Sequence, residues 1–538
     1  MTRSARMLWL AAALLVPALA PQLPAQKAQL GADWFTDKHN GYRLRYPDEW
    51  MAVPVQPREA GAGVVAQMDG PSLATRVANQ SYDFRAGLTI MKFEASQAVT
   101  ETDAEADGGL RGRVDTASGT RDSVESHLKQ MAEWWQLRDF KPAEVEELSF
   151  KDFQTKHQEF SAFTGDVYVL FDTFTFRLDD FDVALVYLVP LEHAPKWQKV
   201  FGASARSFER IVRTAAVTVT DEKDYGQLLA AAADEAARTA GWRVLEVPSQ
   251  RYILKTSSKD EKFLKAIVER LEASRNLFER DFPPSKPIDH VSVVRVCSNL
   301  EEFHKYGKTG GGVAGWFNPG TTELVIVDFK DYDRNLTYGV MTHEAFHQYC
   351  HFLFDESEAH RWFDEGHGDY YGAFEFKGNK AICHANMKGE SRLVGIRDQI
   401  RNDSFTPIGR IIRQNHGEWQ SKGVASYEQS WSMIYMLRRG MEGEVPKRLW
   451  RTEYADIIPE YMRVLHEGFV KAYEEAREEQ KKNAAAEGRE SNGSEELWIS
   501  ERKKEEIWDK AIAASWGQVD LEEFEKHWKE YVLKELKD

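Results

Sequence analysis

The 538-residue sequence predicts an α+β protein. We expect an N-terminal antiparallel α/β sandwich domain, then a domain with a small sheet and a metal-binding helix, and a mostly helical C-terminal part. Three observations support this order. Alternating strand patterns fill residues 30–215, short buried strands precede a run at residues 341–351 that contains no Gly or Pro and suits a buried helix, and helical periodicity dominates beyond that run. The length itself predicts two or more domains.

Composition narrows the class of protein. The apolar fraction of 42% is ample for packed cores, and the formal net charge of -16 argues against nucleic-acid binding. The three cysteines, Cys297, Cys350 and Cys383, are too few for a disulfide framework. A bridge between Cys350 and Cys383 and a set of buried free thiols both remain open.

The N-terminus resembles a secretory signal in its layout. Arg3 and Arg6 precede an apolar stretch at residues 7–20, and Ala25 offers a cleavage position, so residues 1–25 are predicted to be a signal peptide. The apolar stretch is too short for a comfortable membrane span, although an uncleaved anchor is the alternative. We therefore expect an exported protein, periplasmic or secreted, with no stable membrane span after cleavage.

Residues 30–215 form the first predicted domain. Its expected strands and helices are strands at 42–46, 88–93, 155–163, 167–178 and 183–189, and helices at 123–135 and 194–208. His157 and His193 stand isolated in this region, so no metal cluster or nucleophile is expected and the domain is predicted to bind or to scaffold. An Ala-rich segment at residues 216–245 is predicted to be a helical connector.

Residues 246–538 form the second predicted domain. Strands are expected at 252–256, 291–297 and 323–328, with a helix at 259–282 and a Gly-rich loop at 310–320. Later helices are expected at 396–412, 427–439 and 521–536, with a flexible break inside the charged stretch 471–506.

The run at residues 341–351 contains His343, Glu344 and His347 in the pattern H-E-x-x-H. On a helix, residues four apart lie about 6 Å from each other on one face. Both imidazoles can therefore bind one zinc ion at about 2.0–2.1 Å. Glu344 points aside, where it can take a proton from water as a general base.

A second segment at residues 361–371 supplies carboxylates. Glu365, which is expected to begin a short helix, is the candidate third zinc ligand. Asp369 lies four residues later on the same face, where it can accept a hydrogen bond from a zinc-bound imidazole and fix its tautomer. The two segments thus predict one Zn²⁺ per chain.

These motifs resemble known families. HEAFHQ followed by WFDEGHGDYYG is similar to the gluzincin metallopeptidases, whose pattern is H-E-x-x-H and then E-x-x-x-D, and more closely to peptidase-MA-like bacterial proteins. The likeness extends from residue 252 to the C-terminus, and Gly368 stands where the family pattern usually has Ala. The opening strand YRLRYPDEW and the layout of residues 30–215 weakly resemble the PsbP/Mog1-like sandwich.

The gluzincin resemblance implies a zincin-like fold and an exported zinc metallopeptidase that hydrolyses peptide bonds. It implies that Asp369 orients His343, and that an edge strand at 315–317 or 323–327 pairs with the substrate, with Gly315 and Trp316 as contacts. It also implies an oxyanion donor from the later helices. Tyr427 is the candidate, although it could equally be a core aromatic.

Two rival functions remain at this stage. One is a zinc-containing, non-catalytic scaffold or binding protein of the cell envelope, which a fourth protein ligand would favour. The other is a different zinc hydrolase, such as an amidase acting on cell-wall peptides. His351 is too far along the helix axis for the same zinc, and His367 faces away from the metal if Glu365 faces it, so both are expected to be structural.

Overall fold

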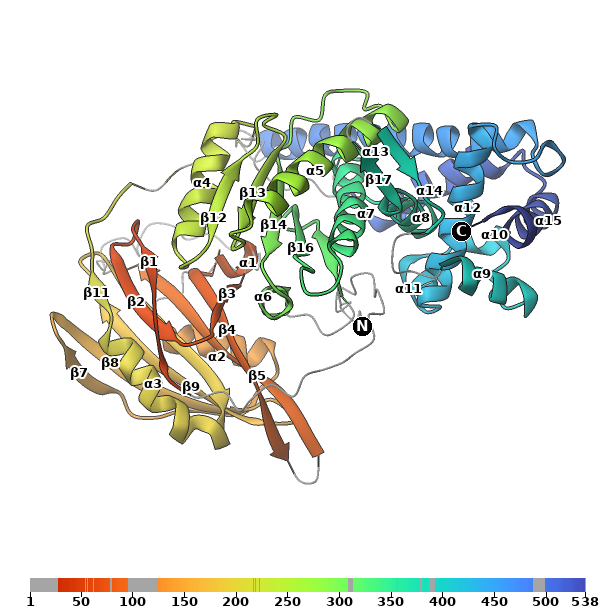
Figure 1. Ribbon diagram of the computed structural model, residues 1–538. Coiled ribbons are helices and arrows are strands. Elements are labelled where there is room, and N and C mark those ends of the chain that lie inside the picture. The colour runs from red at the N-terminus through yellow and green to blue at the C-terminus, as the bar shows by residue number, and fades with distance from the viewer. Residues whose placement is uncertain are drawn as a thin grey trace.

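The computed structural model describes residues 28–94, 123–307, 313–486 and 499–537, without residues 54, 56, 61, 78–79, 216, 218, 222, 356, 378–379 and 387–391. The predicted signal peptide at residues 1–25 lies outside these residues. The chain is a mixed α+β protein with antiparallel sheets and a helical C-terminal part, as the sequence predicted (Figure 1).

The N-terminal region is built on an eight-stranded antiparallel sheet. Its strands are β3 (Met51–Val53), β4 (Val64–Val77), β5 (Gln80–Glu94), β6 (Arg138–Pro142), β7 (Glu146–Phe150), β8 (Phe153–Phe163), β9 (Tyr168–Arg177) and β10 (Phe181–Pro190). The order is β3-β4-β5-β10-β9-β8-β6, and β7 also pairs with β8. Every strand predicted in this region overlaps an observed one.

Both faces of this sheet are covered. Helix α3 (Ala194–Arg206) and a three-stranded sheet of β1 (Leu30–Asp37), β2 (Tyr42–Pro47) and β11 (Glu209–Arg210) pack on one face. Helix α2 (Val124–Trp134) packs on the other, and α1 (Pro57–Ala60) follows β3 in the chain. Because strand side chains alternate between faces, β10 contributes Val183 and Leu185 to the α3 side and Ala184 and Val186 to the α2 side.

The second region contains a mixed five-stranded sheet in the order β12-β13-β14-β16-β15. Its strands are β12 (Arg243–Glu246), β13 (Tyr252–Thr256), β14 (Ser292–Cys297), β15 (Gly315–Asn318) and β16 (Glu323–Val327). Helices α5 (Glu261–Asp281) and α7 (Arg334–Leu353) cover one face, whereas α4 (Tyr225–Ala237) and α6 (Leu300–Gly307) lie on the other. Strands β12 and β15 are the two edges of this sheet.

The predicted helical connector at 216–245 contains helix α4. This helix packs against Ile253 of β13, and the segment continues into β12, which pairs with β13. The segment is therefore part of the second region. Tyr225 and Ala232 of α4 cover the sheet at Ile253.

The C-terminal part is a set of helices that share a hydrophobic core with α7 (Figure 1). They are α8 (Arg361–Gly372), α9 (Arg392–Arg401), α10 (Ile408–Ile411), α11 (His416–Gln420), α12 (Val424–Met441), α13 (Ile457–Ala486), α14 (Glu501–Trp516) and α15 (Leu521–Glu530). A hairpin of β17 (Phe374–Lys377) and β18 (Lys380–Cys383) follows α8. Among the described helices, none has the length and apolar composition needed to cross a membrane.

The single helix predicted at 396–412 is also corrected, because the chain forms α9 and α10 there with a break between them. Helix α9 ends at Arg401, Asp403 has a positive φ of 51°, and Pro407 marks the start of α10. Proline disfavours the helical conformation of the residue before it and cannot donate a main-chain hydrogen bond. It stands as the N-terminal cap of α10, and the side chain of Gln429 bonds the main chain of Thr406.

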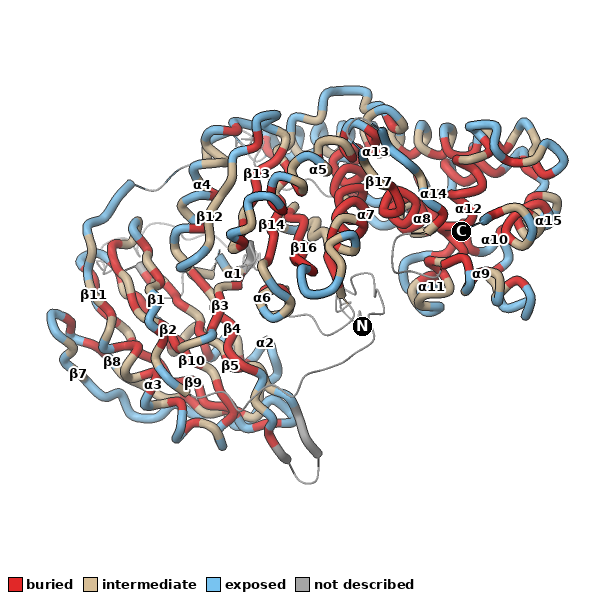
Figure 2. Tube along the Cα trace, in the orientation of Figure 1, coloured by how far each residue is buried: buried red, intermediate tan, exposed pale blue. Residues whose placement is uncertain are grey.

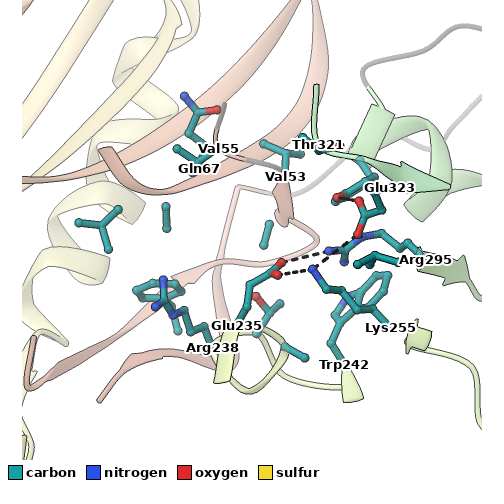
Figure 3. Close-up of a pocket in the computed structure, with 18 residues that line it drawn as sticks. Val53, Val55, Gln67, Glu235, Arg238, Trp242, Lys255, Arg295, Thr321 and Glu323 are labelled. Carbon is teal, nitrogen blue, oxygen red and sulfur yellow. Dashed lines mark hydrogen bonds and ion pairs between the residues drawn. The ribbon is translucent and has the colours of Figure 1, made fainter. Parts of the chain in front are cut away.

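The two halves of the chain meet around a cavity of about 300 Å³ (Figure 3). Val53 lines it from the sandwich, and five charged residues line it from the second region. Four of them pair with one another: Arg295 Nη2 lies 3.0 Å from Glu235 Oε1, Arg295 Nε lies 3.1 Å from Glu323 Oε1, and Lys255 pairs with Glu235. The fifth, Arg238, pairs with Asp234. Each charge at this junction is therefore matched by an opposite one.

Candidate metal centre

The central element of the candidate site is helix α7. Asp333 caps its N-terminus by accepting a hydrogen bond from the Asn335 amide, and the helix then runs without Gly or Pro through residues 340–353. Most of this run is buried, because α7 lies between the five-stranded sheet and α8 (Figure 2). Its histidines are consequently held in a closely packed part of the molecule.

Helix α8 packs against both α7 and α12. It begins at Arg361, four residues before the sequence-based expectation that Glu365 starts it. A Cβ atom built on Gly366 would lie 2.8 Å from the Ser430 carbonyl oxygen of α12, and one on Gly368 would lie 2.8 Å from Cε1 of His343. The two glycines thus allow α8 to approach both neighbouring helices.

The three predicted ligands converge. Nε2 of His343 lies 3.2 Å, and Nε2 of His347 lies 3.4 Å, from the same oxygen, Oε2 of Glu365. The three donor atoms all lie within 4.8 Å of one another. Two imidazole nitrogens and one carboxylate oxygen are a donor set that suits zinc, so the residues present fit the predicted ion.

Each imidazole is oriented from behind by a carboxylate. Nδ1 of His343 lies 3.1 Å from Oδ1 of Asp369, the pairing that the gluzincin resemblance implied. Nδ1 of His347 lies 2.9 Å from Oδ1 of Asp364, a partner that the sequence reasoning missed. Arg392 lies behind Asp369, with Nε 2.9 Å from Oδ2. Both rings therefore direct Nε2 towards the shared position.

The short distances between these side chains shift the pKa values of His343 and Glu365. Burial favours neutral His343, but the hydrogen bonds to Asp369 and Glu365 outweigh it and raise the pKa of His343 to about 10. Burial also opposes ionisation of Glu365, yet the positive charge of His347 holds the pKa of Glu365 well below its usual range. In the metal-free protein an ionised carboxylate therefore lies beside protonated imidazoles, and a cation that binds there displaces their protons.

Glu344 faces the sheet edge. Its Oε2 accepts a hydrogen bond of 2.9 Å from the main-chain N–H of Phe317 in β15. Burial raises the pKa of the Glu344 carboxyl above its usual range. A Cβ atom on Gly315 would lie 2.5 Å from Val340 and 3.4 Å from Cγ of Glu344, so glycine lets the edge strand lie against α7 at this point.

Tyr427, the candidate oxyanion donor, lies beside the predicted ligands, whereas the indole of Trp316, a predicted substrate contact, does not. The Tyr427 hydroxyl is 3.5 Å from Oε1 of Glu365, which places it beside the ligand set, although its ring also packs on Trp419 within the core. The Trp316 indole points to the other face of β15 and packs against Phe303. Of the two predicted substrate contacts, Gly315 faces α7, and Trp316 can face the same side only through its main chain.

The remaining histidines and the cysteines have structural surroundings. His351 packs against Phe317, and burial lowers its pKa to about 4. His367 bonds the Phe363 carbonyl through Nδ1, facing away from the ligands. All three cysteines, each within the described chain, are free thiols, so Cys350 and Cys383 are not paired.

Comparison with known proteins identifies no family for this chain. No family model matches the chain, and no curated protein matches it. Solved structures that match include PsbP (CyanoP) from Synechocystis sp. PCC 6803, with 16% identity and a TM-score of 0.23 over 36% of this chain and 98% of that one. This likeness concerns the N-terminal region.

Two further structures have similar scores. A Pseudomonas aeruginosa protein of unknown function, described as a putative regulator, has 10% identity and a TM-score of 0.18 over 34% of this chain and 96% of that one. A Bacteroides thetaiotaomicron VPI-5482 protein has 10% identity and a TM-score of 0.21 over 65% of this chain and 85% of that one. Scores this low support no conclusion about function.

Proposed function

We propose that this chain is an exported, zinc-dependent metallopeptidase with a zincin-like second domain, in which His343, His347 and Glu365 hold the ion. The single observation that carries the proposal is the convergence of both Nε2 atoms on one oxygen of Glu365. A bound zinc ion polarises a substrate carbonyl group and lowers the pKa of water. Localisation outside the cytoplasm rests on the N-terminal sequence alone.

Glu344 is the general base of this proposal. It neighbours His343 in the chain and lies on the side of the ligand set that faces β15. Because its pKa is raised by burial, its carboxylate is a better proton acceptor than an exposed glutamate. It takes a proton from water at its carboxylate and later passes the proton to the leaving amine. Tyr427 is the candidate donor to the oxyanion.

The edge position of β15 supports a peptide as the substrate. The strand pairs with β16 on one side, and the Phe317 N–H is directed to Glu344 instead. An extended peptide can add to such an edge through main-chain hydrogen bonds, which places a peptide bond beside the metal ligands. The substrate class is therefore a peptide or protein in extended conformation.

The test is Glu344→Gln, which keeps the size and the hydrogen-bonding oxygen of the side chain. We expect the variant to retain one zinc ion at the centre while peptide hydrolysis falls by roughly 10²–10⁴-fold. Glu428→Gln is the matched control, because burial also raises the pKa of Glu428 but its carboxylate bonds Gln399 away from the ligands. Metal analysis and degradomics on the three proteins provide the measurements.

A non-catalytic zinc protein is the second candidate, and one observation favours it. The ligands are deeply buried, with only 4% of the His343 side chain and 12% of the His347 side chain exposed. If wild type and Glu344→Gln leave identical peptide profiles while both hold zinc, the scaffold function replaces the peptidase. An amidase acting on cell-wall peptides would instead show activity on those peptides that Glu344→Gln abolishes.

A further inference from the structure

Three donor side chains lie together on the β8–β9 hairpin of the N-terminal domain. His157 and Glu159 are two residues apart on β8, so their side chains lie on the same face of the sheet. Asp172 of β9 stands directly opposite Glu159 in the antiparallel register. The sequence reasoning treated His157 as isolated, because its neighbours come partly from another strand.

The donor atoms of these residues are as close as those of the candidate metal centre. Nε2 of His157 lies 2.8 Å from Oδ1 of Asp172, and all three donor atoms lie within 4.8 Å of one another. Within the described part of the chain, only this group and the His343 group bring three His, Cys, Asp or Glu donors so close together. The His157 group and the His343 group therefore have donor atoms at similar spacing.

The imidazole of His157 is oriented in the same way as that of His343. Its Nδ1 lies 3.4 Å from Oε2 of Glu146 on β7, which leaves Nε2 facing Asp172. The ring also stacks on Phe174, with the ring centres 4.6 Å apart. Gln198 of α3 donates a hydrogen bond of 2.6 Å to Oε1 of Glu159, so that carboxylate is fixed as well.

The charge balance of this group favours a cation. Three carboxylates, those of Glu146, Glu159 and Asp172, surround one imidazole. The ion pairs of Glu146 and Asp172 both go to His157, and no lysine or arginine in the described chain pairs with any of the three. Only 2% of the Asp172 side chain is exposed, and a buried carboxylate is costly unless a positive charge lies beside it.

We propose that His157, Glu159 and Asp172 form a second divalent-cation site, with Glu146 as the positioning residue behind the imidazole. One imidazole nitrogen with two carboxylate oxygens suits a first-row transition ion such as Zn²⁺ better than Mg²⁺ or Ca²⁺. Water completes the coordination, because 19% of the His157 side chain is exposed. Such an ion links β8 to β9 beside α3, and the proposal is independent of any peptidase activity.

The test measures Zn²⁺ binding to the full-length, metal-free protein by competition with a chromophoric chelator. We expect wild type to bind two equivalents and a His343→Ala/His347→Ala variant to keep one. Adding His157→Ala to that variant should remove the remaining equivalent. Asp172→Asn, which preserves size, should weaken it by roughly tenfold or more. X-ray absorption of the one-site variant should show a coordination shell of nitrogen and oxygen atoms without sulfur.

The control is His193→Ala, since His193 is a half-buried histidine of the same domain that bonds a main-chain carbonyl. It should leave both equivalents unchanged. His157→Ala in the otherwise intact chain provides a second route, because stoichiometry should fall from two to one even if the triple variant is poorly folded. The proposal is overturned if the His343→Ala/His347→Ala variant binds no zinc, or if its zinc survives both His157→Ala and Asp172→Asn.

Discussion

Replacement of Gly368 by alanine tests how α8 positions the metal ligands. The added Cβ would lie 2.8 Å from Cε1 and 2.9 Å from Nδ1 of His343. Ordinary contact begins at 3.4 Å, so the ring must retreat by 3.4 − 2.8 = 0.6 Å. That exceeds the roughly 0.2 Å tolerance of metal–ligand distances. A retreat of the ring also disturbs the 3.1 Å contact between its Nδ1 and Oδ1 of Asp369.

Two opposing effects determine how Gly368→Ala changes the free energy of unfolding. Overpacking a closed site costs about 1–3 kcal/mol of unfolding free energy, whereas replacing a helical glycine by alanine stabilises by roughly 0.5–1 kcal/mol. We expect a net loss of about 1 kcal/mol in metal-free protein and a roughly tenfold or greater loss of zinc affinity. Thermal unfolding in a chelator and zinc competition with a chromophoric chelator measure the two effects separately.

Gly202→Ala in α3 is the matched control. Its nearest neighbour is the flexible guanidinium of Arg206 at 3.6 Å, so the helix should gain stability and zinc binding at the metal centre should not change. The family pattern has Ala at the position of Gly368, so the resemblance alone would predict tolerance. If Gly368→Ala binds zinc as tightly as wild type, the close contact with His343 does not position the ligand and the reasoning from geometry fails.

Three further outcomes follow from the same geometry. Tyr427→Phe should lower kcat by roughly 10²–10³-fold at unchanged zinc content, because it removes a hydrogen-bond donor beside the predicted ligands. An unchanged kcat would mean that the Tyr427 side chain only packs in the core. Asp364→Asn should weaken zinc binding roughly 10–100-fold in a competition assay, because Nδ1 of His347 loses its carboxylate; undiminished affinity would contradict that role. Burial lowers the pKa of His351 and His360 from 6.5 to about 4, so the unfolded chain binds more protons over that range. Stability against urea should therefore fall as pH decreases from 6.5 to about 4, and should fall less in a variant with glutamine at both positions.

The convergence of His343, His347 and Glu365 could be expected from the sequence because the geometry of each pair is local. The four-residue spacing of His343 and His347 fixes their common face, and the same spacing relates Glu365 to Asp369. The role of Asp364 could not be predicted in that way. It depends on how α8 lies against α7, which is set by the glycines of α8 and by the packing of α12.

Contacts made by main-chain groups or between paired strands cannot be predicted from residue spacing in the same way. The donor to Glu344 is the amide of Phe317, and any residue except proline has such a group. The group around His157 is likewise assembled by strand register, since Asp172 is opposite Glu159 only after β8 and β9 have paired. Sequence spacing predicts what one helix places on a face, whereas these contacts are determined when separate elements pack.

The hydrogen bond from the Phe317 N–H to Glu344 connects β15, the proposed substrate-binding strand, with the proposed general base. A charge-assisted bond of this kind contributes about 1.5–3 kcal/mol, which is enough to hold Glu344 against the sheet edge in the free protein. A peptide that adds to β15 needs the same edge, and its own main-chain groups can take over the Phe317 N–H. We therefore expect substrate binding to release Glu344 towards the ligands. A short substrate that cannot pair with β15 should lose kcat as well as affinity, and equal kcat for short and extended substrates would exclude this coupling.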